Sequence, residues 1–119
     1  MDREERLQAT YEAFNARDVE AVLAQMTDDV DWPNAFEGGR VLGRAAVRDY
    51  WLRQWTVIDP NVRPVRSMPR PDDTLAVEVE QVVRDMDGTL LLEGRVLHVY
   101  TFRGDLIARM DIEEARDDD

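Results

Sequence analysis

The stretch that decides the fold is Arg95-Val-Leu-His-Val-Tyr-Thr-Phe102, continued by Arg103-Gly-Asp105 and by Leu106-Ile-Ala-Arg-Met-Asp-Ile-Glu113. Two runs rich in β-branched and aromatic residues flank a short segment that contains glycine, which is typical of a β-hairpin. If Gly104 and Asp105 form the turn, with glycine supplying a positive φ, the strands pair in a defined register. His98 then lies opposite Asp111, and Tyr100 lies opposite Arg109.

Side chains alternate between the two faces of a strand, so this register also predicts the faces of the hairpin. One face carries the two polar pairs together with four further residues: Val96, Phe102, Ile107 and Glu113. The other face is apolar and should pack against another element; it carries Leu97, Val99, Ala108, Met110 and Ile112. The polar face is either open to water or lines a polar cavity, and the function depends on which of the two holds.

The first half of the chain has the periodicity of helices. A first helix is expected from about Arg3 to Ala16, and Asp18 is a suitable N-cap for a second. Gly43 precedes a third helix, which should stop at Ile58-Asp-Pro60. The expected buried positions of the three helices are, in order, Leu7, Tyr11 and Phe14; Val19, Val22, Leu23 and Met26; and Val47, Trp51 and Trp55.

The second half has the pattern of strands. Asp87-Gly88 is a strong hairpin turn, and it places Val77 opposite His98 and Val79 opposite Val96. The strands are expected at Val30–Trp32, Arg40–Leu42, Val62–Met68 and Thr74–Arg84. Pro64 and Pro69 predict that the third of them is either an edge strand or an irregular one. Helices first and strands last predict an α+β fold, with the helices on one face of a curved sheet.

Residues 1–119 are expected to form one domain, with fraying at residues 1–4 and 115–119 and a solvated Asp117-Asp-Asp tail. The chain has no cysteine and one histidine, and its formal net charge is −11. Thiolate chemistry is therefore excluded and a metal site is not expected. The negative charge opposes binding to nucleic acid or to an anionic membrane. A charged amino terminus and the lack of a long apolar run predict a cytoplasmic protein.

Four segments resemble the nuclear transport factor 2-like superfamily, in particular its SnoaL-like (polyketide cyclase and steroid isomerase-like) members. They are Ala13-Phe-Asn-Ala-Arg-Asp18, Met26-Thr-Asp-Asp-Val-Asp-Trp32, Gly43-Arg-Ala-Ala-Val-Arg-Asp-Tyr-Trp51, and His98-Val-Tyr-Thr-Phe through Arg109-Met-Asp111. The resemblance implies a cone-shaped α+β barrel, in which three helices and a bent sheet enclose a pocket, and a homodimer. It also implies that the face carrying His98 faces this pocket.

Fold does not fix chemistry in this superfamily, so each known reaction depends on whether its residues are present in this chain. The general base of steroid isomerases falls on Asn34, an amide, and their tyrosine falls on Thr10, with Tyr11 one position away. Their second acid falls on His98. Epoxide hydrolase-like members need an Arg-x-Asp pattern, which the strand of His98 lacks. Scytalone dehydratase-like members need more histidines than the single one present here. SnoaL-like cyclases fit best, because they place a His and an Asp on the last two strands.

In that resemblance His98 and Asp111 are the acid/base pair of a cofactor-independent enzyme of the isomerase, cyclase or lyase type, acting on an apolar carbonyl compound. Asp31 is an alternative base, and Trp51 and Trp55 are expected to be core. The other candidate residues would contact a small apolar or aromatic ligand: Trp32, Asn34, Tyr50, Tyr100, Arg109, Val77, Val79 and Val96. Whether the protein is an enzyme stays open, and the alternative is a non-catalytic ligand-binding or dimerising module.

Overall fold

The computed structural model describes residues 2–35 and 37–115. The chain has three described helices: α1 (Arg3–Asn15), α2 (Val19–Leu23) and α3 (Arg44–Val57). Two strands separate α2 from α3. Residues 2–4, which were expected to fray, form the cap and first turn of α1, where Asp2 accepts a hydrogen bond of 2.8 Å from the backbone of Glu5. The expected tail at residues 117–119 lies outside the described residues.

The described strands form one sheet in the order β2-β1-β6-β5-β4-β3. Their bounds are β1 Met26–Pro33, β2 Arg40–Leu42, β3 Ile58–Pro69, β4 Leu75–Asp85, β5 Leu90–Arg103 and β6 Leu106–Glu114. The pairs are antiparallel except for β1 with β6, which run parallel. The predicted α+β class is confirmed, and the curved sheet is open because its edge strands β2 and β3 do not pair.

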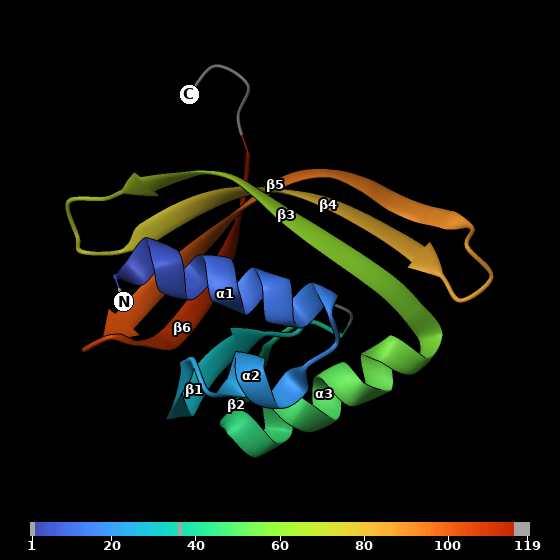
Figure 1. Cartoon of the computed structure of the whole chain (residues 1–119), viewed down its shortest axis with the longest axis horizontal. Coiled ribbons are helices and arrows are strands. Elements are labelled where there is room, and N and C mark those ends of the chain that lie inside the picture. Colours follow the sequence, from blue (N-terminus) through green and yellow to red (C-terminus); the bar gives the residue numbers. More distant parts are fainter. Residues whose placement is uncertain (1, 36, 116–119) are drawn as a thin grey trace.

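The helices cover one side of this sheet. Figure 1 shows α1 against the bent part formed by β3, β4 and β5, while the β4–β5 hairpin projects past the end of the helix. Leu7 and Tyr11 of α1 are buried against the sheet, as their spacing predicted. The second helix is shorter than expected, because Met26 begins β1 instead of continuing the helix.

The segment between the first two helices also fixes the edge strand β3. Asn15 donates from Nδ2 to the carbonyl of Val62 (2.7 Å) and accepts at Oδ1 from its N–H (3.0 Å). Asp18 then caps α2 by accepting from the N–H of Ala21 at 3.2 Å. The Asn-Ala-Arg-Asp segment thus joins the end of α1 to β3 and starts α2.

The register of the β4–β5 hairpin agrees with the sequence prediction. Val77 pairs with His98, Val79 with Val96, and Glu80 with Arg95. The edge position predicted for the strand that contains Pro64 is also confirmed, since β3 ends the described sheet. The β5–β6 hairpin departs from prediction, and this departure decides which residues reach the cavity.

Candidate functional site

A cavity of about 470 Å³ lies between the helices and the concave face of the sheet. That volume is within the range of small-molecule sites. Two exposed apolar residues near the start of β5, Leu91 and Leu92, mark the open end of the cavity, and the exposed Ile112 of β6 also lines it. The rest of the wall is largely apolar and aromatic, formed by Thr10, Tyr11, Phe14, Val22, Trp32, Pro33, Ala35, Tyr50, Trp51, Gln54, Ile58, Pro60, Val62, Gln81, Val83, Val96, His98, Tyr100 and Met110.

Three hydrogen-bonding side chains meet at the closed end of the cavity. Tyr11 comes from α1, while His98 and Tyr100 come from the same face of β5; their exposed fractions are 4%, 8% and 1%. The Tyr100 hydroxyl donates to the Tyr11 oxygen at 2.7 Å, and the Tyr11 oxygen lies 2.9 Å from His98 Nδ1. The imidazole also stacks on the Tyr11 ring, with centroids 5.9 Å apart.

Burial sets the protonation of all three groups. It lowers the pKa of His98 from 6.5 to about 4, and it raises the pKa of both tyrosines above the usual value. At neutral pH the imidazole is therefore uncharged and both phenols keep their protons. Since the Tyr11 oxygen accepts from Tyr100, its own proton is free for Nδ1, and the ring proton of His98 belongs on Nε2.

His98 Nε2 has no hydrogen-bond partner among the described residues, and His98 lines the cavity. The described lining residues include neither a carboxylate nor a guanidinium group. The site is therefore an uncharged cavity with a single N–H group available at its closed end. A neutral acceptor atom on a ligand is the natural partner for such a group.

The predicted pairing of His98 with Asp111 is wrong. His98 pairs with Ile112, and Asp111 pairs with Val99, one position away from the prediction. The register shifts between Thr101 and Phe102, where Ala108 is the extra residue of β6. A shift of one residue moves every following side chain to the other face of the strand.

Burial of apolar side chains explains this bulge. Ile107 and Met110 are both buried inside, with exposed fractions of 0% and 2%, although they are three positions apart. In a regular strand, inward Ile107 would bring Arg109 and Asp111 inward as well. Placing two ionised side chains in an apolar cavity would cost far more than one unpaired backbone position.

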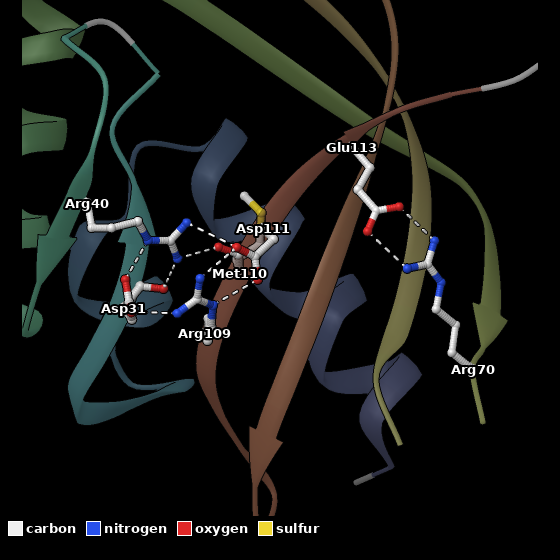
Figure 2. A network of polar contacts seen from close by, with 7 residues as sticks. All are labelled: Asp31, Arg40, Arg70, Arg109, Met110, Asp111 and Glu113. Carbon is white, nitrogen blue, oxygen red and sulfur yellow. Dashed lines mark hydrogen bonds and ion pairs between the residues drawn. The ribbon is translucent and has the colours of Figure 1, made fainter. Parts of the chain in front are cut away.

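Asp111 and Arg109 lie on the outer face instead, where they form a network with Asp31 and Arg40 (Figure 2). Arg109 donates to Asp111 at 2.9 Å and to Asp31 at 3.0 Å, and Arg40 donates to Asp31 at 2.6 Å and to Asp111 at 3.2 Å. Arg40 also reaches the carbonyl of Met110 at 2.7 Å. The network ties the short edge strand β2 to β1 and β6.

Charge pairing dominates the electrostatics of this outer network. The hydrogen bond from Arg109 lowers the pKa of Asp111, and Asp111 in turn raises the pKa of Arg109. An ionised, paired carboxylate on the face opposite the cavity cannot exchange protons with His98. Asp31, the alternative base in the sequence prediction, is held in the same network and is likewise excluded from the cavity.

The remaining candidate residues divide into three groups. Trp32, Tyr50, Tyr100 and Val96 line the cavity, as does Trp51, which was expected to be core. Val77 and Val79 are buried in the core and are not among the lining residues. Asn34 lies in a turn, where its Oδ1 accepts from the backbone of Glu37 at 2.9 Å, and its neighbours Pro33 and Ala35 line the cavity instead.

Tyr11 is a site residue that the sequence did not identify as one. The sequence places it in the buried stripe of the first helix and one position away from the tyrosine position of the steroid isomerases. A tyrosine in such a stripe must find a partner for its hydroxyl, and the histidine of the facing sheet was an available partner. That combination was the signal that could have found it.

Within residues 2–35 and 37–115, no group of three His, Cys, Asp or Glu side chains is placed to hold a metal ion. None of the helices described here is long and apolar enough to cross a membrane.

Solved structures share this fold. TerC, co-crystallised with polyporic acid, is 25% identical with a TM-score of 0.82, over 95% of this chain and 91% of TerC. A proposed polyketide cyclase from Pseudomonas putida is 21% identical with a TM-score of 0.82, over 99% and 95% of the two chains. RV0760c from Mycobacterium tuberculosis, in complex with estradiol-17beta-hemisuccinate, is 21% identical with a TM-score of 0.76, over 91% and 89%.

No curated protein sequence matches this chain. The model of the SnoaL-like domain matches residues 7–110, which include all three helices from Leu7 onward and the sheet as far as Met110. The curved open sheet, its apolar cavity and this match together identify the chain as a member of the SnoaL-like domain family.

Proposed function

We propose that this protein binds a small, uncharged, largely apolar molecule, and that an oxygen atom of this ligand accepts a hydrogen bond from His98 Nε2. The supporting observation is the chain of hydrogen bonds from Tyr100 through Tyr11 to His98 at the closed end of the cavity. This chain occupies Nδ1 and leaves Nε2–H for the ligand. A carbonyl compound, which the family resemblance implies, fits this donor.

The absence of charge on the described cavity wall supports an uncharged ligand. A carboxylate entering the closed end would lose its hydration without meeting a cation, which is strongly unfavourable. Two similar proteins were crystallised with small molecules, TerC with polyporic acid and RV0760c with estradiol-17beta-hemisuccinate, which supports a small-molecule ligand for this cavity.

A cofactor-independent acid/base enzyme of the isomerase, cyclase or lyase type is the second candidate. A neutral imidazole held in one tautomer can stabilise the negative charge that develops on a carbonyl oxygen. Removal of a proton also needs a base, and a pKa of about 4 makes His98 a weak one. Asp111 lies on the outer face, so binding without chemistry is the better-supported function.

Titration with a matched pair of probes tests the proposal. 2-Acetonaphthone is an uncharged aromatic ketone, and 2-naphthoate has a similar shape but carries a carboxylate. Trp32 and Trp51 line the cavity, so binding should change tryptophan fluorescence. The ketone is expected to bind more than tenfold more tightly than the carboxylate, and His98→Phe should weaken ketone binding roughly tenfold.

Asp111→Asn is the control, because it changes a hydrogen-bonding group on the opposite face and should leave ketone binding unchanged. Equal affinity for the two probes, or ketone binding that is insensitive to His98→Phe, would contradict the proposal. Exchange of the ketone's α-hydrogens for deuterium can be measured by NMR. If it occurs and is lost in His98→Phe, the result would instead favour the acid/base enzyme as the function.

We also propose a homodimer formed through the outer face of the sheet. A second apolar cluster of Ala76, Leu97 and Val99, each no more than 7% exposed, lies just beneath that face, with Met68 packed against it. Ion pairs such as Arg70–Glu113 at 2.9 Å surround it. Sedimentation equilibrium should give twice the monomer mass, whereas a monomer at 100 µM would overturn this part of the proposal. Location in the cytoplasm stays a prediction from the sequence.

A further inference from the structure

Gln81 is a polar side chain on the apolar wall between the closed and open ends of the cavity. It lies on β4, between Val62 of β3 and Gly94 of β5 in the sheet register. Alternation along β4 places it on the same face as Val79 and Val83, and it lines the cavity. A half-buried amide in such surroundings needs hydrogen-bond partners.

The amide of Gln81 makes no hydrogen bond to any described residue. The other three glutamines all make one: Gln8 with Glu12 at 3.1 Å, Gln25 with Arg6 at 2.6 Å, and Gln54 with Tyr50 at 3.3 Å. Unlike the other glutamines, Gln81 therefore has both its amide N–H donor and its carbonyl acceptor available to a ligand in the cavity.

Space is available beside this amide. The residue opposite it is Gly94, and a side-chain carbon added at Gly94 would meet no atom within 4 Å. Gly94 has none of the positive φ values that require glycine at other positions of the chain. No side chain from this cross-strand neighbour therefore covers the amide of Gln81.

The spacing between Gln81 and His98 sets the length of that ligand. His98 pairs with Val77, and Gln81 is four residues further along β4. At a rise of about 3.3 Å per residue, the two positions are roughly 13 Å apart along the strand. Between them the inner face carries only valines, Val79 and its partner Val96. The wall is therefore polar, apolar and polar again along its length.

We infer that Gln81 determines specificity by binding a second polar group of the ligand. The ligand class is then an elongated, uncharged molecule with an apolar middle and an oxygen at each end, one facing His98 Nε2 and one facing the amide of Gln81. This inference rests on the proposed function, because it assumes that the ligand occupies the cavity with its first oxygen at His98.

Two probes that differ by one hydroxyl group test the inference. 4-Hydroxybiphenyl carries a hydroxyl at one end, and 4,4′-dihydroxybiphenyl carries one at each end. For the unchanged protein, the second hydroxyl should tighten binding about fivefold beyond the statistical gain of two equivalent ends. In Gln81→Met, which keeps the length of the side chain and removes its polar atoms, this gain should disappear. Gln8→Met, on the exposed side of α1, is the matched control and should keep the full gain.

A gain from the second hydroxyl that persists in Gln81→Met would overturn the role of Gln81 and leave the proposed function intact. A missing gain in the unchanged protein, with 4-hydroxybiphenyl still bound, would do the same. Failure of both biphenyls and of 2-acetonaphthone to bind would overturn the proposed function, and this inference with it.

Discussion

At the scale of single residues, the charge and the tautomer of His98 are set by the residues that surround it. Burial makes the imidazole neutral, and Tyr11 fixes which nitrogen carries the proton. The carboxylate expected beside it from the sequence lies on the other side of the sheet. The residue that seemed to be half of a charged pair is therefore a neutral hydrogen-bond donor in an apolar cavity.

The depressed pKa of His98 predicts a loss of stability in acid. In the unfolded chain the imidazole takes up a proton near pH 6.5, whereas in the folded protein it does so only near pH 4. The unfolded state thus binds more protons between these values, and stability falls as the pH falls. From pH 7 to pH 4.5 this contribution amounts to about 2 kcal/mol.

Urea unfolding at the two pH values, for the unchanged protein and for His98→Gln, measures this contribution. Carboxylates contribute equally to both proteins, so the variant should lose about 2 kcal/mol less on acidification. An identical loss in both proteins would show that the histidine is not kept neutral by the fold.

The direction of the hydrogen bonds among the two tyrosines and the histidine predicts an order of stabilities. Tyr100→Phe removes a donor and leaves only an acceptor site on Tyr11 empty, at an expected cost of about 1 kcal/mol. Tyr11→Phe leaves the Tyr100 hydroxyl and His98 Nδ1 both without partners, and should cost about 2 to 3 kcal/mol. Chemical denaturation of the two variants gives the order, and a larger loss for Tyr100→Phe would contradict the hydrogen-bond direction.

At the scale of elements, one extra residue in β6 decides which side chains face the cavity. The Ala108 bulge turns Met110 inward and Asp111 outward. The sequence contains its signature, because apolar residues at Ile107, Met110 and Ile112 break strict alternation once. The outward-facing acids and arginines then become the ion-pair network that holds the edge strand β2 (Figure 2).

The contact between α1 and β3 is a second element-scale feature that can be tested. Asn15 satisfies both the N–H and the carbonyl of Val62. Asn15→Ala should therefore lower the free energy of unfolding by about 2 kcal/mol, since two half-buried backbone groups lose their partners. Asn15→Asp keeps the acceptor for the N–H and should lose less. Equal losses in thermal or urea unfolding would rule out this contact as the cause.

At the scale of the whole molecule, the net charge of −11 is spread over a body of 41 × 37 × 26 Å. At 0.01 M salt the screening length is about 30 Å, so charges repel each other across the entire protein, whereas at 0.15 M it is about 8 Å. Contact ion pairs such as Arg103–Asp29 at 2.9 Å are shorter than either length. Salt should therefore weaken the repulsion more than it weakens the pairs.

This difference predicts that Tm rises when NaCl increases from 0.01 to 0.15 M at pH 7. Differential scanning calorimetry at fixed protein concentration checks the direction. A Tm that falls over this range would mean that the ion pairs of the outer face contribute more to stability than self-repulsion removes.

Most of the fold could be predicted from local patterns. The helices at Leu7–Phe14 and Val47–Trp55 and the β4–β5 register follow from periodicity and from the Asp87-Gly88 turn. The candidate site could be predicted only in part, because a turn fixes the register near itself and a bulge further along changes it. Partners from distant elements, such as Tyr11 for His98, have no short-range signal at all.

The sequence by itself determined the α+β class, the helix faces, the pairing of Val77 with His98 and the resemblance to the SnoaL-like family. Only the tertiary structure decided that His98 meets Tyr11 and Tyr100 and that Asp111 faces outward. It also decided that the amide of Gln81 lines the cavity without a hydrogen-bond partner among the described residues. Periodicity and turns involve residues that are close in the sequence, so the sequence alone is enough to recognise them. The choice of face on β6 depended on which side chains could be buried together once all the elements had packed, and no single segment contains that information.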